Sequence, residues 1–336
     1  MRIKIEVVFF CSLLLGVVWV FFVLTTNPTK NPTESSGQWK TIIEESNLSH
    51  TIPLLPIGFV NKDVGIAVRG LSILKTTDSG LNWKIVYDDE NIGVYNGIFT
   101  DRMAGWVVGT KNFETPLVLR SNDSGITWTS TPFSQSSVAE ITSQFTYFRD
   151  ICFDRNNDAW IIGDGGVVQV ENKDNELHLV TFFPTDEGLY RVSCSDSGEV
   201  WAVGIKNSVF HYLNGWRRYD LNEEYVFSNV KTFGEDVWLI GKDDSDMGIL
   251  LRSRDGGKKW EDKSPVSVGE LNDLYLERGK GWLVGAGGTI FQTIDSGDSW
   301  TKSSSPTKRD LLHIFFLDTS NGWISGDTGI MLKFED

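Results

Sequence analysis

Four aspartates in this chain stand at a fixed spacing from a glycine and a tryptophan, and repeated carboxylates could serve as acids, bases or metal ligands. The pattern is Ser/Thr-x-Asp-x-Gly-x-x-Trp, and its aspartates are Asp78, Asp123, Asp255 and Asp295. An aspartate can accept hydrogen bonds from backbone N–H groups further along the chain, and glycine tolerates the positive φ of a tight turn. A catalytic carboxylate is needed once, whereas a turn is needed in every repeat. The repetition therefore favours four stabilised β-turns.

The turns belong to a longer repeat, which a second set of tryptophans marks. The strand pattern Trp-x-Val/Ile-Gly recurs, with its first position at Ile66, Trp106, Trp160, Trp201, Trp238, Trp282 and Trp323. The spacing averages about 43 residues, which is the period of a four-stranded propeller blade. Short apolar runs between Gly-, Asp- and Asn-rich turns are typical of strands, and no segment after the N-terminal part shows sustained helical periodicity. The sequence predicts an all-β, seven-bladed propeller over residues 38–336.

The seventh unit lacks a fourth strand of its own, because Asp336 follows soon after Trp323. Trp39, ahead of the first unit, looks like an orphaned fourth strand. We expect residues 38–43 to complete the last blade and close the ring, which removes open sheet edges. The third unit lacks the second tryptophan that marks the fourth strand of other units. Residues 177–183 are expected to form its fourth strand.

The first part of the chain is expected to lie outside the fold. Residues 7–24 form an apolar segment, and at about 1.5 Å per residue it is just long enough to cross a bilayer. No small-x-small cleavage motif follows it, and Cys11 stands too early for a lipoprotein cleavage site. We expect an uncleaved transmembrane anchor with residues 1–6 in the cytoplasm, residues 25–37 as a linker and the propeller outside the cytoplasm. A cleaved signal peptide is the alternative.

Composition excludes several functions. The formal net charge of −14 argues against a nucleic-acid partner and against a polybasic contact with anionic lipid. No nucleophile elbow, zinc-protease motif, phosphate loop or dinucleotide-binding pattern occurs, so no cofactor is expected. Cys152 and Cys194 occupy equivalent positions in neighbouring units. They could form a disulfide, but two buried free thiols are the favoured interpretation, and their spacing fits no metal site.

The repeated turn resembles the Asp-box of sialidase-type propellers. Together with the repeated Gly-Trp-x-Val-Gly strands, it looks more narrowly like the photosystem II stability and assembly factor family over residues 38–336. That resemblance implies a non-enzymatic scaffold on the periplasmic or luminal side of a membrane, with a membrane protein or an assembly intermediate as its partner. The chain departs from photosynthetic members in lacking an Arg-rich face and in keeping an apolar N-terminal segment. Photosystem II itself is therefore not the expected partner.

A binding site is expected at the mouth of the central channel, because the first strand of each blade lines a propeller's axis. Polar residues stand at the corresponding position of most units and could form a recognition surface. The candidates are Asn96, Arg149, Asp150, Tyr190, Arg191, Asn229, Asn272, Asp273 and His313. A solvated rim without a ligand is the alternative.

A glycan-binding or glycan-cleaving propeller of the cell envelope is the alternative function. Glycoside hydrolysis needs two carboxylates, or in sialidases a tyrosine paired with a glutamate. Glu223, Glu224 and Tyr225 supply these residue types in one local cluster. Residues 147–153 only partly match the arginine segment of sialidases and fall in the third unit. We therefore predict a binding protein with no catalytic residue and no metal.

Overall fold

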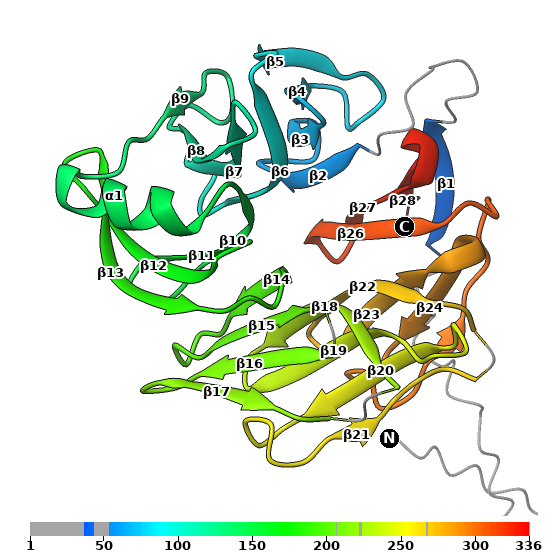
Figure 1. Cartoon of the computed structure of the whole chain (residues 1–336). Coiled ribbons are helices and arrows are strands. Elements are labelled where there is room, and N and C mark those ends of the chain that lie inside the picture. The colour runs from blue at the N-terminus through cyan, green and yellow to red at the C-terminus, as the bar shows by residue number, and fades with distance from the viewer. Residues whose placement is uncertain (1–36, 44–53, 206, 222–223, 267, 336) are drawn as a thin grey trace, which may run out of the picture. The chain divides into compact units, whose positions relative to one another are not determined.

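Seven four-stranded antiparallel sheets, numbered here as blades 1 to 7, form the propeller (Figure 1). The computed structural model describes residues 37–43, 54–205, 207–221, 224–266 and 268–335. Within these residues the sheets succeed one another along the chain around a common axis. The all-β, seven-bladed architecture predicted from the repeat is confirmed.

Each blade is a meander whose first strand lies at the axis. Blade 1 consists of β2 (Leu55–Phe59), β3 (Gly65–Arg69), β4 (Ser72–Thr76) and β5 (Lys84–Asp88). Blade 2 consists of β6 (Ile92–Phe99), β7 (Gly105–Lys111), β8 (Thr115–Ser121) and β9 (Thr129–Ser130). Blade 3 consists of β10 (Phe148–Phe153), β11 (Ala159–Gly163), β12 (Gly166–Lys173) and β13 (Glu176–Pro184). Blade 4 consists of β14 (Leu189–Cys194), β15 (Val200–Gly204), β16 (Ser208–Tyr212) and β17 (Trp216–Tyr219). Blade 5 consists of β18 (Val226–Phe233), β19 (Asp236–Lys242), β20 (Gly248–Ser253) and β21 (Glu261–Asp262). Blade 6 consists of β22 (Leu271–Glu277), β23 (Lys280–Gly285), β24 (Thr289–Thr293) and β25 (Thr301–Lys302), with the 3₁₀ turn η1 (Ala286–Gly288) between its second and third strands.

Blade 7 contains strands from both ends of the described chain. Its sheet runs β26 (Leu311–Asp318), β27 (Asn321–Gly326), β28 (Met331–Glu335) and β1 (Gln38–Ile43), with η2 (Asp327–Gly329) before β28. Trp39 pairs with Phe334, and its ring is 5.7 Å from Phe316. The segment expected to close the ring therefore supplies the outer strand of the last blade.

The second strand of each blade is largely buried, and in four blades its tryptophan is covered by the cross-strand residue of the third strand. Trp201 pairs with His211, and their rings stack at 4.0 Å. Trp238 pairs with Arg252, whose guanidinium lies 4.8 Å from the indole centroid. A cation–π interaction of this kind stabilises the guanidinium against the aromatic ring in a region that water does not reach.

The four repeated aspartates form turns between the third and fourth strands. Ser121 donates to Asp123 Oδ1 at 2.8 Å, and the Thr127 N–H donates to the same oxygen at 2.9 Å. The hydrogen bonds from the Thr127 hydroxyl and backbone lower the pKa of Asp123 to about 2. These bonds stabilise the carboxylate as part of the turn.

The glycine of each Asp-box lies against the second strand of the preceding blade. A Cβ atom on Gly257 would lie 2.6 Å from Trp201, and one on Gly297 would lie 2.5 Å from Trp238. The Asp-box turn of one blade therefore packs against the second-strand tryptophan of the blade before it. Only glycine permits this approach together with a positive φ.

One helix was not expected from the sequence. α1 (Gln135–Gln144) lies between β9 and β10, and Ile141 anchors it in a core cluster with Phe145 and Phe148. The helix is short and mostly polar, so a single buried aliphatic residue left no periodic pattern to recognise.

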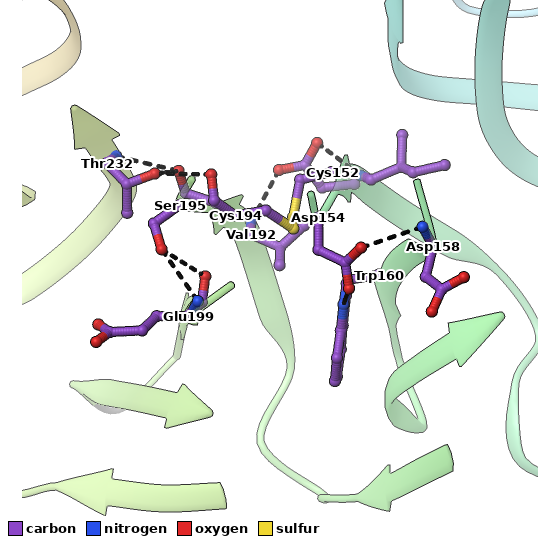
Figure 2. The surroundings of a disulfide bond; sticks show 12 residues. Cys152, Asp154, Asp158, Trp160, Val192, Cys194, Ser195, Glu199 and Thr232 are labelled. Carbon is purple, nitrogen blue, oxygen red and sulfur yellow. Dashed lines mark hydrogen bonds between the residues drawn. A yellow bond between two sulfur atoms is a disulfide. The ribbon is translucent and has the colours of Figure 1, made fainter. Parts of the chain in front are cut away.

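The interpretation of the two cysteines as free thiols is wrong. Cys152 of β10 and Cys194 of β14 form a disulfide, with their Cα atoms 5.7 Å apart (Figure 2). They lie in adjacent axial strands, but not at equivalent positions as the sequence suggested, because Cys152 pairs with Trp160 whereas Ser193, one residue before Cys194, pairs with the equivalent Trp201.

The expected anchor at residues 7–24 lies outside the described residues, as do residues 1–6 and nearly all of the linker at 25–37. Among the helices that the structure describes, none has the length and apolar character needed to cross a bilayer.

Candidate functional site at the propeller axis

The axial strand of every blade contains a β-bulge at the same position. In each blade one residue is skipped in the pairing with the second strand, and pairing resumes at the next residue. Pairing resumes at Gly58, Asn96, Asp150, Arg191, Asn229, Asp273 and His313. The skipped residues are Ile57, Tyr95, Arg149, Tyr190, Ser228, Asn272 and Leu312. A bulge changes the direction of side chains, so it separates the sequence candidates into two groups.

The first group lines an axial cavity of about 580 Å³ to which all seven blades contribute. Its members are Asn96, Asp150, Arg191, Asn229, Asp273 and His313. The cavity continues along the axial strands to the turns that follow them, where Thr100, Asp154 and Asn157 form its wall. The remaining candidates, Arg149, Tyr190 and Asn272, are bulged residues and are not part of this wall.

Asp150 connects three consecutive blades. Its Oδ1 accepts a hydrogen bond from Asn96 Nδ2 of blade 2 at 2.6 Å. Its Oδ2 accepts one from the Val192 N–H of blade 4 at 2.9 Å. The side chain is 5% exposed, so these bonds replace the solvation that a buried carboxylate loses.

Asp273 repeats this arrangement in the other half of the ring. Its Oδ1 accepts a hydrogen bond from Asn229 Nδ2 of blade 5 at 3.0 Å, and its Oδ2 accepts one from the Ile314 N–H of blade 7 at 3.0 Å. Asp273 is 2% exposed. Two of the sequence candidates are thus structural connectors between blades as well as parts of the cavity wall.

The two aspartates differ in their electrostatic environment. Burial raises the pKa of Asp150, and the more distant Arg191 only partly offsets this effect. Burial would also raise the pKa of Asp273, but the ammonium group of Lys231, 2.9 Å from its Oδ1, and the His313 ring outweigh it and hold that pKa below its usual range. A cation in direct contact therefore distinguishes two otherwise equivalent carboxylates.

His313 adds an imidazole to the same group. Its Nδ1 lies 3.8 Å from Asp273 Oδ2. Burial lowers the pKa of the ring, while the carboxylate acts in the opposite direction. Lys231 and His313 therefore share one buried carboxylate, and Lys231 was not among the sequence candidates because it stands two residues beyond the bulge.

The bulged residues form aromatic and cationic contacts next to the cavity. The Arg149 guanidinium lies 4.7 Å from the ring centroid of Tyr190. Tyr95, which is 39% exposed, is in an edge-to-face contact with Tyr147 at 5.6 Å. Asn272 donates to the Leu311 carbonyl at 2.8 Å. The sequence search included Arg149, Tyr190 and Asn272 but missed Tyr95, because in that unit it chose the next residue, Asn96.

The disulfide forms part of the cavity wall, and blade 5 contacts it through hydroxyl groups (Figure 2). Thr232 donates through its hydroxyl to the Cys194 carbonyl at 2.9 Å. The Thr232 N–H donates to Ser193 Oγ at 3.1 Å. Blades 3, 4 and 5 are therefore connected covalently and by hydrogen bonds at this level of the axis.

The two buried aspartates of the axial cavity are already engaged by hydrogen bonds. Both oxygens of Asp150 and of Asp273 already accept hydrogen bonds, whereas Arg191 donates, among the described residues, one bond, to the Tyr190 carbonyl at 2.9 Å. In the part of the chain that the structure describes, no cluster of His, Cys, Asp and Glu side chains is suited to hold a metal ion. Of the sialidase-like cluster, Tyr225 packs against the core beneath blade 5, and Glu223 lies outside the described residues.

The chain is similar in sequence to photosystem II assembly proteins. The family model for the photosynthesis system II assembly factor YCF48 matches residues 262–335. The photosystem II assembly lipoprotein Ycf48 of Synechococcus sp. (strain CC9902) is 22% identical over 323 residues, which cover 91% of each chain. The protein of the same name from Prochlorococcus marinus is 25% identical over 338 residues, again covering 91% of each.

Solved structures show the same fold. A structure described as YCF48 bound to D1 peptide superposes with a TM-score of 0.70 at 21% identity, covering 89% of this chain and 97% of that one. A virginiamycin B lyase from Staphylococcus aureus gives a TM-score of 0.67 at 12% identity, covering 89% and 99%. The chain is therefore a seven-bladed Asp-box β-propeller that resembles the photosystem II assembly factors.

Proposed function

We propose that this protein is an assembly factor that holds an extended segment of a membrane protein at the axis of its propeller, outside the cytoplasm. The observation that carries the proposal is the axial cavity of about 580 Å³, to which every blade contributes. A cavity of this size at the meeting point of all structural units is where ligands are expected to bind. The resemblance to the photosystem II assembly factors supports the same role.

The side chains around the cavity suit a peptide. Arg191 and Lys231 can donate to carbonyl and carboxylate groups, and Arg149 and Tyr190 present a stacked planar surface next to them. YCF48 has been solved with a D1 peptide bound, which makes a peptide the natural class of ligand to test here. Catalysis is not part of the proposal, because both oxygens of Asp150 and of Asp273 already accept hydrogen bonds.

Attachment to a membrane is also proposed, through residues 7–24. Relatives are named lipoproteins, so a lipid on a cysteine is the competing mode, and Cys11 is the cysteine of that segment. A helix should keep the full-length protein in membranes after alkaline carbonate extraction, and Cys11→Ser should not change this. Release of the Cys11→Ser protein would show lipid attachment instead.

Site-specific photocrosslinking tests the binding proposal. A benzoylphenylalanine at Tyr95 or Tyr190 should yield a crosslinked membrane protein in the native membrane. The control position is Ile85, which is 56% exposed on the outer strand β5. Arg149→Gln combined with Arg191→Gln should abolish the product formed from Tyr95. Equal crosslinking from Ile85, or an undiminished product in the double variant, would contradict the proposal.

A further inference from the structure

An apolar groove lies between blades 1 and 2, and we call it the blade 1–2 groove. It has a volume of about 340 Å³, and its lining includes the buried side chains of Val68 in β3 and Val94 in β6. Among the described residues that line it, Arg69 is the charged one and none is acidic. The groove therefore presents a largely apolar surface.

The groove is contiguous with the axial cavity along two neighbouring axial strands. In β2, Leu55 lines the groove, and residues 56 and 57, which follow it, line the axial cavity. In β6, residues 93–95 line the groove, and residues 96 and 97 line the cavity. A segment that leaves the cavity between blades 1 and 2 would therefore enter the groove directly.

Three large apolar or aromatic side chains of the groove are exposed. Leu71, in the turn between β3 and β4, is 39% exposed, and Phe113, in the turn between β7 and β8, is 59% exposed. A Cβ on Gly93 would lie 3.5 Å from the Phe113 ring and 3.6 Å from the hydroxyl of Tyr95, so both side chains lie over this glycine. Exposed apolar side chains that gather around a concave surface mark an interaction site.

The backbone of Phe113 lies in the left-handed region, with φ of 58°. The other non-glycine residues with positive φ in the described part of the chain are Asn, Asp, Ser, Thr or Arg, so Phe113 is the apolar one among them. A bulky side chain disfavours this conformation, and a side chain as exposed as this one adds little to the core. The turn and the core therefore do not explain a phenylalanine at this position, whereas a role in binding does.

We propose that the blade 1–2 groove binds an apolar side chain of the extended segment that the axial cavity holds. The segment continues from the cavity past Tyr95, and its apolar side chain packs between Leu71 and Phe113. This inference rests on the proposed function, because the continuity of the groove with the axial cavity identifies the occupant. A charged side chain would lose its solvation here, since most of the lining offers it no polar partner.

Photocrosslinking of the full-length protein in its native membrane tests the inference. A benzoylphenylalanine at Leu71 should yield the same crosslinked membrane protein as one at Tyr190, next to the axial cavity. Mass spectrometry should place the two crosslinks within about ten residues of one another, since ten extended residues span about 33 Å. The partner residue crosslinked from Leu71 should lie beside an apolar side chain.

Two substitutions of Phe113 separate binding from folding. Phe113→Gly and Phe113→Asn remove the ring and introduce residues that tolerate a positive φ. Both should lower the yield of the product formed from Tyr190 about tenfold, as expected when a binding surface loses an aromatic anchor. Met103→Asn is the matched control, because Met103 is 58% exposed in the turn between β6 and β7 of the same blade and is not part of the groove lining. It should keep the full yield, and the Phe113 variants should unfold thermally at no lower a temperature than this control.

The outcomes distinguish this inference from the proposed function. Absence of a product from Tyr190 contradicts binding at the axis and the groove inference with it. A product from Tyr190 without one from Leu71, or an undiminished Tyr190 product in both Phe113 variants, overturns the groove inference alone. Crosslinking from Leu71 to lipid or to a different protein also overturns it, because the groove would then face the membrane or a second partner.

Discussion

Asp273 accepts a hydrogen bond from Asn229 across the boundary between blades 5 and 6, at 3.0 Å. Asp150 and Asn96 form the equivalent bond between blades 2 and 3. Because each carboxylate also accepts a backbone N–H from the following blade, one aspartate connects blades 2 to 4 and the other connects blades 5 to 7. The ring thus contains two three-blade groups, and blade 1, with Gly58 at this position, stands between them.

Replacing either connector should destabilise the fold. Asp273→Asn and Asp150→Asn each introduce an amide donor where the carboxylate accepted a bond, and each should lower the free energy of unfolding by about 1–3 kcal/mol. Asp273→Asn should cost more, because it leaves the ammonium group of Lys231 without its partner. Urea unfolding at neutral pH measures both. Asp186→Asn, at an exposed site, is the control, and a cost no larger than that of the control would contradict the connector role.

Acid should weaken the Asp-box turns. The hydrogen bonds from the Thr127 hydroxyl and backbone lower the pKa of Asp123 to about 2, and those from Ser299 do the same for Asp295. A lowered pKa contributes stability that is complete above the unfolded value of 3.8 and is lost as the pH falls toward about 2. Thermal unfolding measured from pH 5 down to pH 2 should show this loss, reduced in a variant with both Asp123→Asn and Asp295→Asn. An unchanged pH profile in that variant would place the acid sensitivity elsewhere.

Much of the fold could be predicted because its signals repeat. Trp106 and its six equivalents recur with the period of a blade, so one local pattern predicted seven sheets and the closing strand at Trp39. The helix α1 and the disulfide occur once, so no repeated pattern could predict them. The position of Cys152 and Cys194 in equivalent strands was visible in the sequence, but the separation of their side chains depends on how two blades pack.

The candidate site was predictable in position and less so in role. The axial strand could be identified from the sequence, and Asn96 and Asp273 of that strand line the axial cavity. Whether a side chain enters the cavity depends on the bulge, which skips Arg149 and resumes at Asp150. A bulge is a pairing relationship between two strands, so the sequence of one strand does not reveal it.

The contact between an Asp-box glycine and the preceding blade can be tested with adjacent glycines. Gly256 and Gly257 both have positive φ, of 67° and 81°. A Cβ on Gly257 would lie 2.6 Å from Trp201, whereas a Cβ on Gly256 would have no atom within 4 Å. Both alanine variants carry the backbone cost of about 1 kcal/mol, and Gly257→Ala should cost about 1–3 kcal/mol more because it overpacks a buried indole. Equal unfolding midpoints would show that the contact is unimportant.

The disulfide should stabilise the propeller by reducing the conformational entropy of the unfolded chain. It joins residues 42 positions apart, and closing a loop of this kind contributes about 2–4 kcal/mol. The double variant with Cys152→Ser and Cys194→Ser should therefore unfold at lower denaturant concentration, and reductant should lower the stability of the unmodified protein but not of the variant. Mass spectrometry after alkylation shows whether the bond is present. Stability that does not change on reduction would contradict this role.

The closing strand β1 should contribute chiefly through Trp39. The indole is 5% exposed and lies 5.2 Å from the ring of Phe334, so Trp39→Ala should lower the free energy of unfolding by about 3–5 kcal/mol. Lys40 is the control on the same strand, because its ion pair with Glu335 is exposed and should contribute less than about 1 kcal/mol. Hydrogen exchange should also show faster opening of β28 in Trp39→Ala, since β28 loses its protected edge. If Trp39→Ala unfolds like Lys40→Ala, the ring does not depend on this strand for its closure.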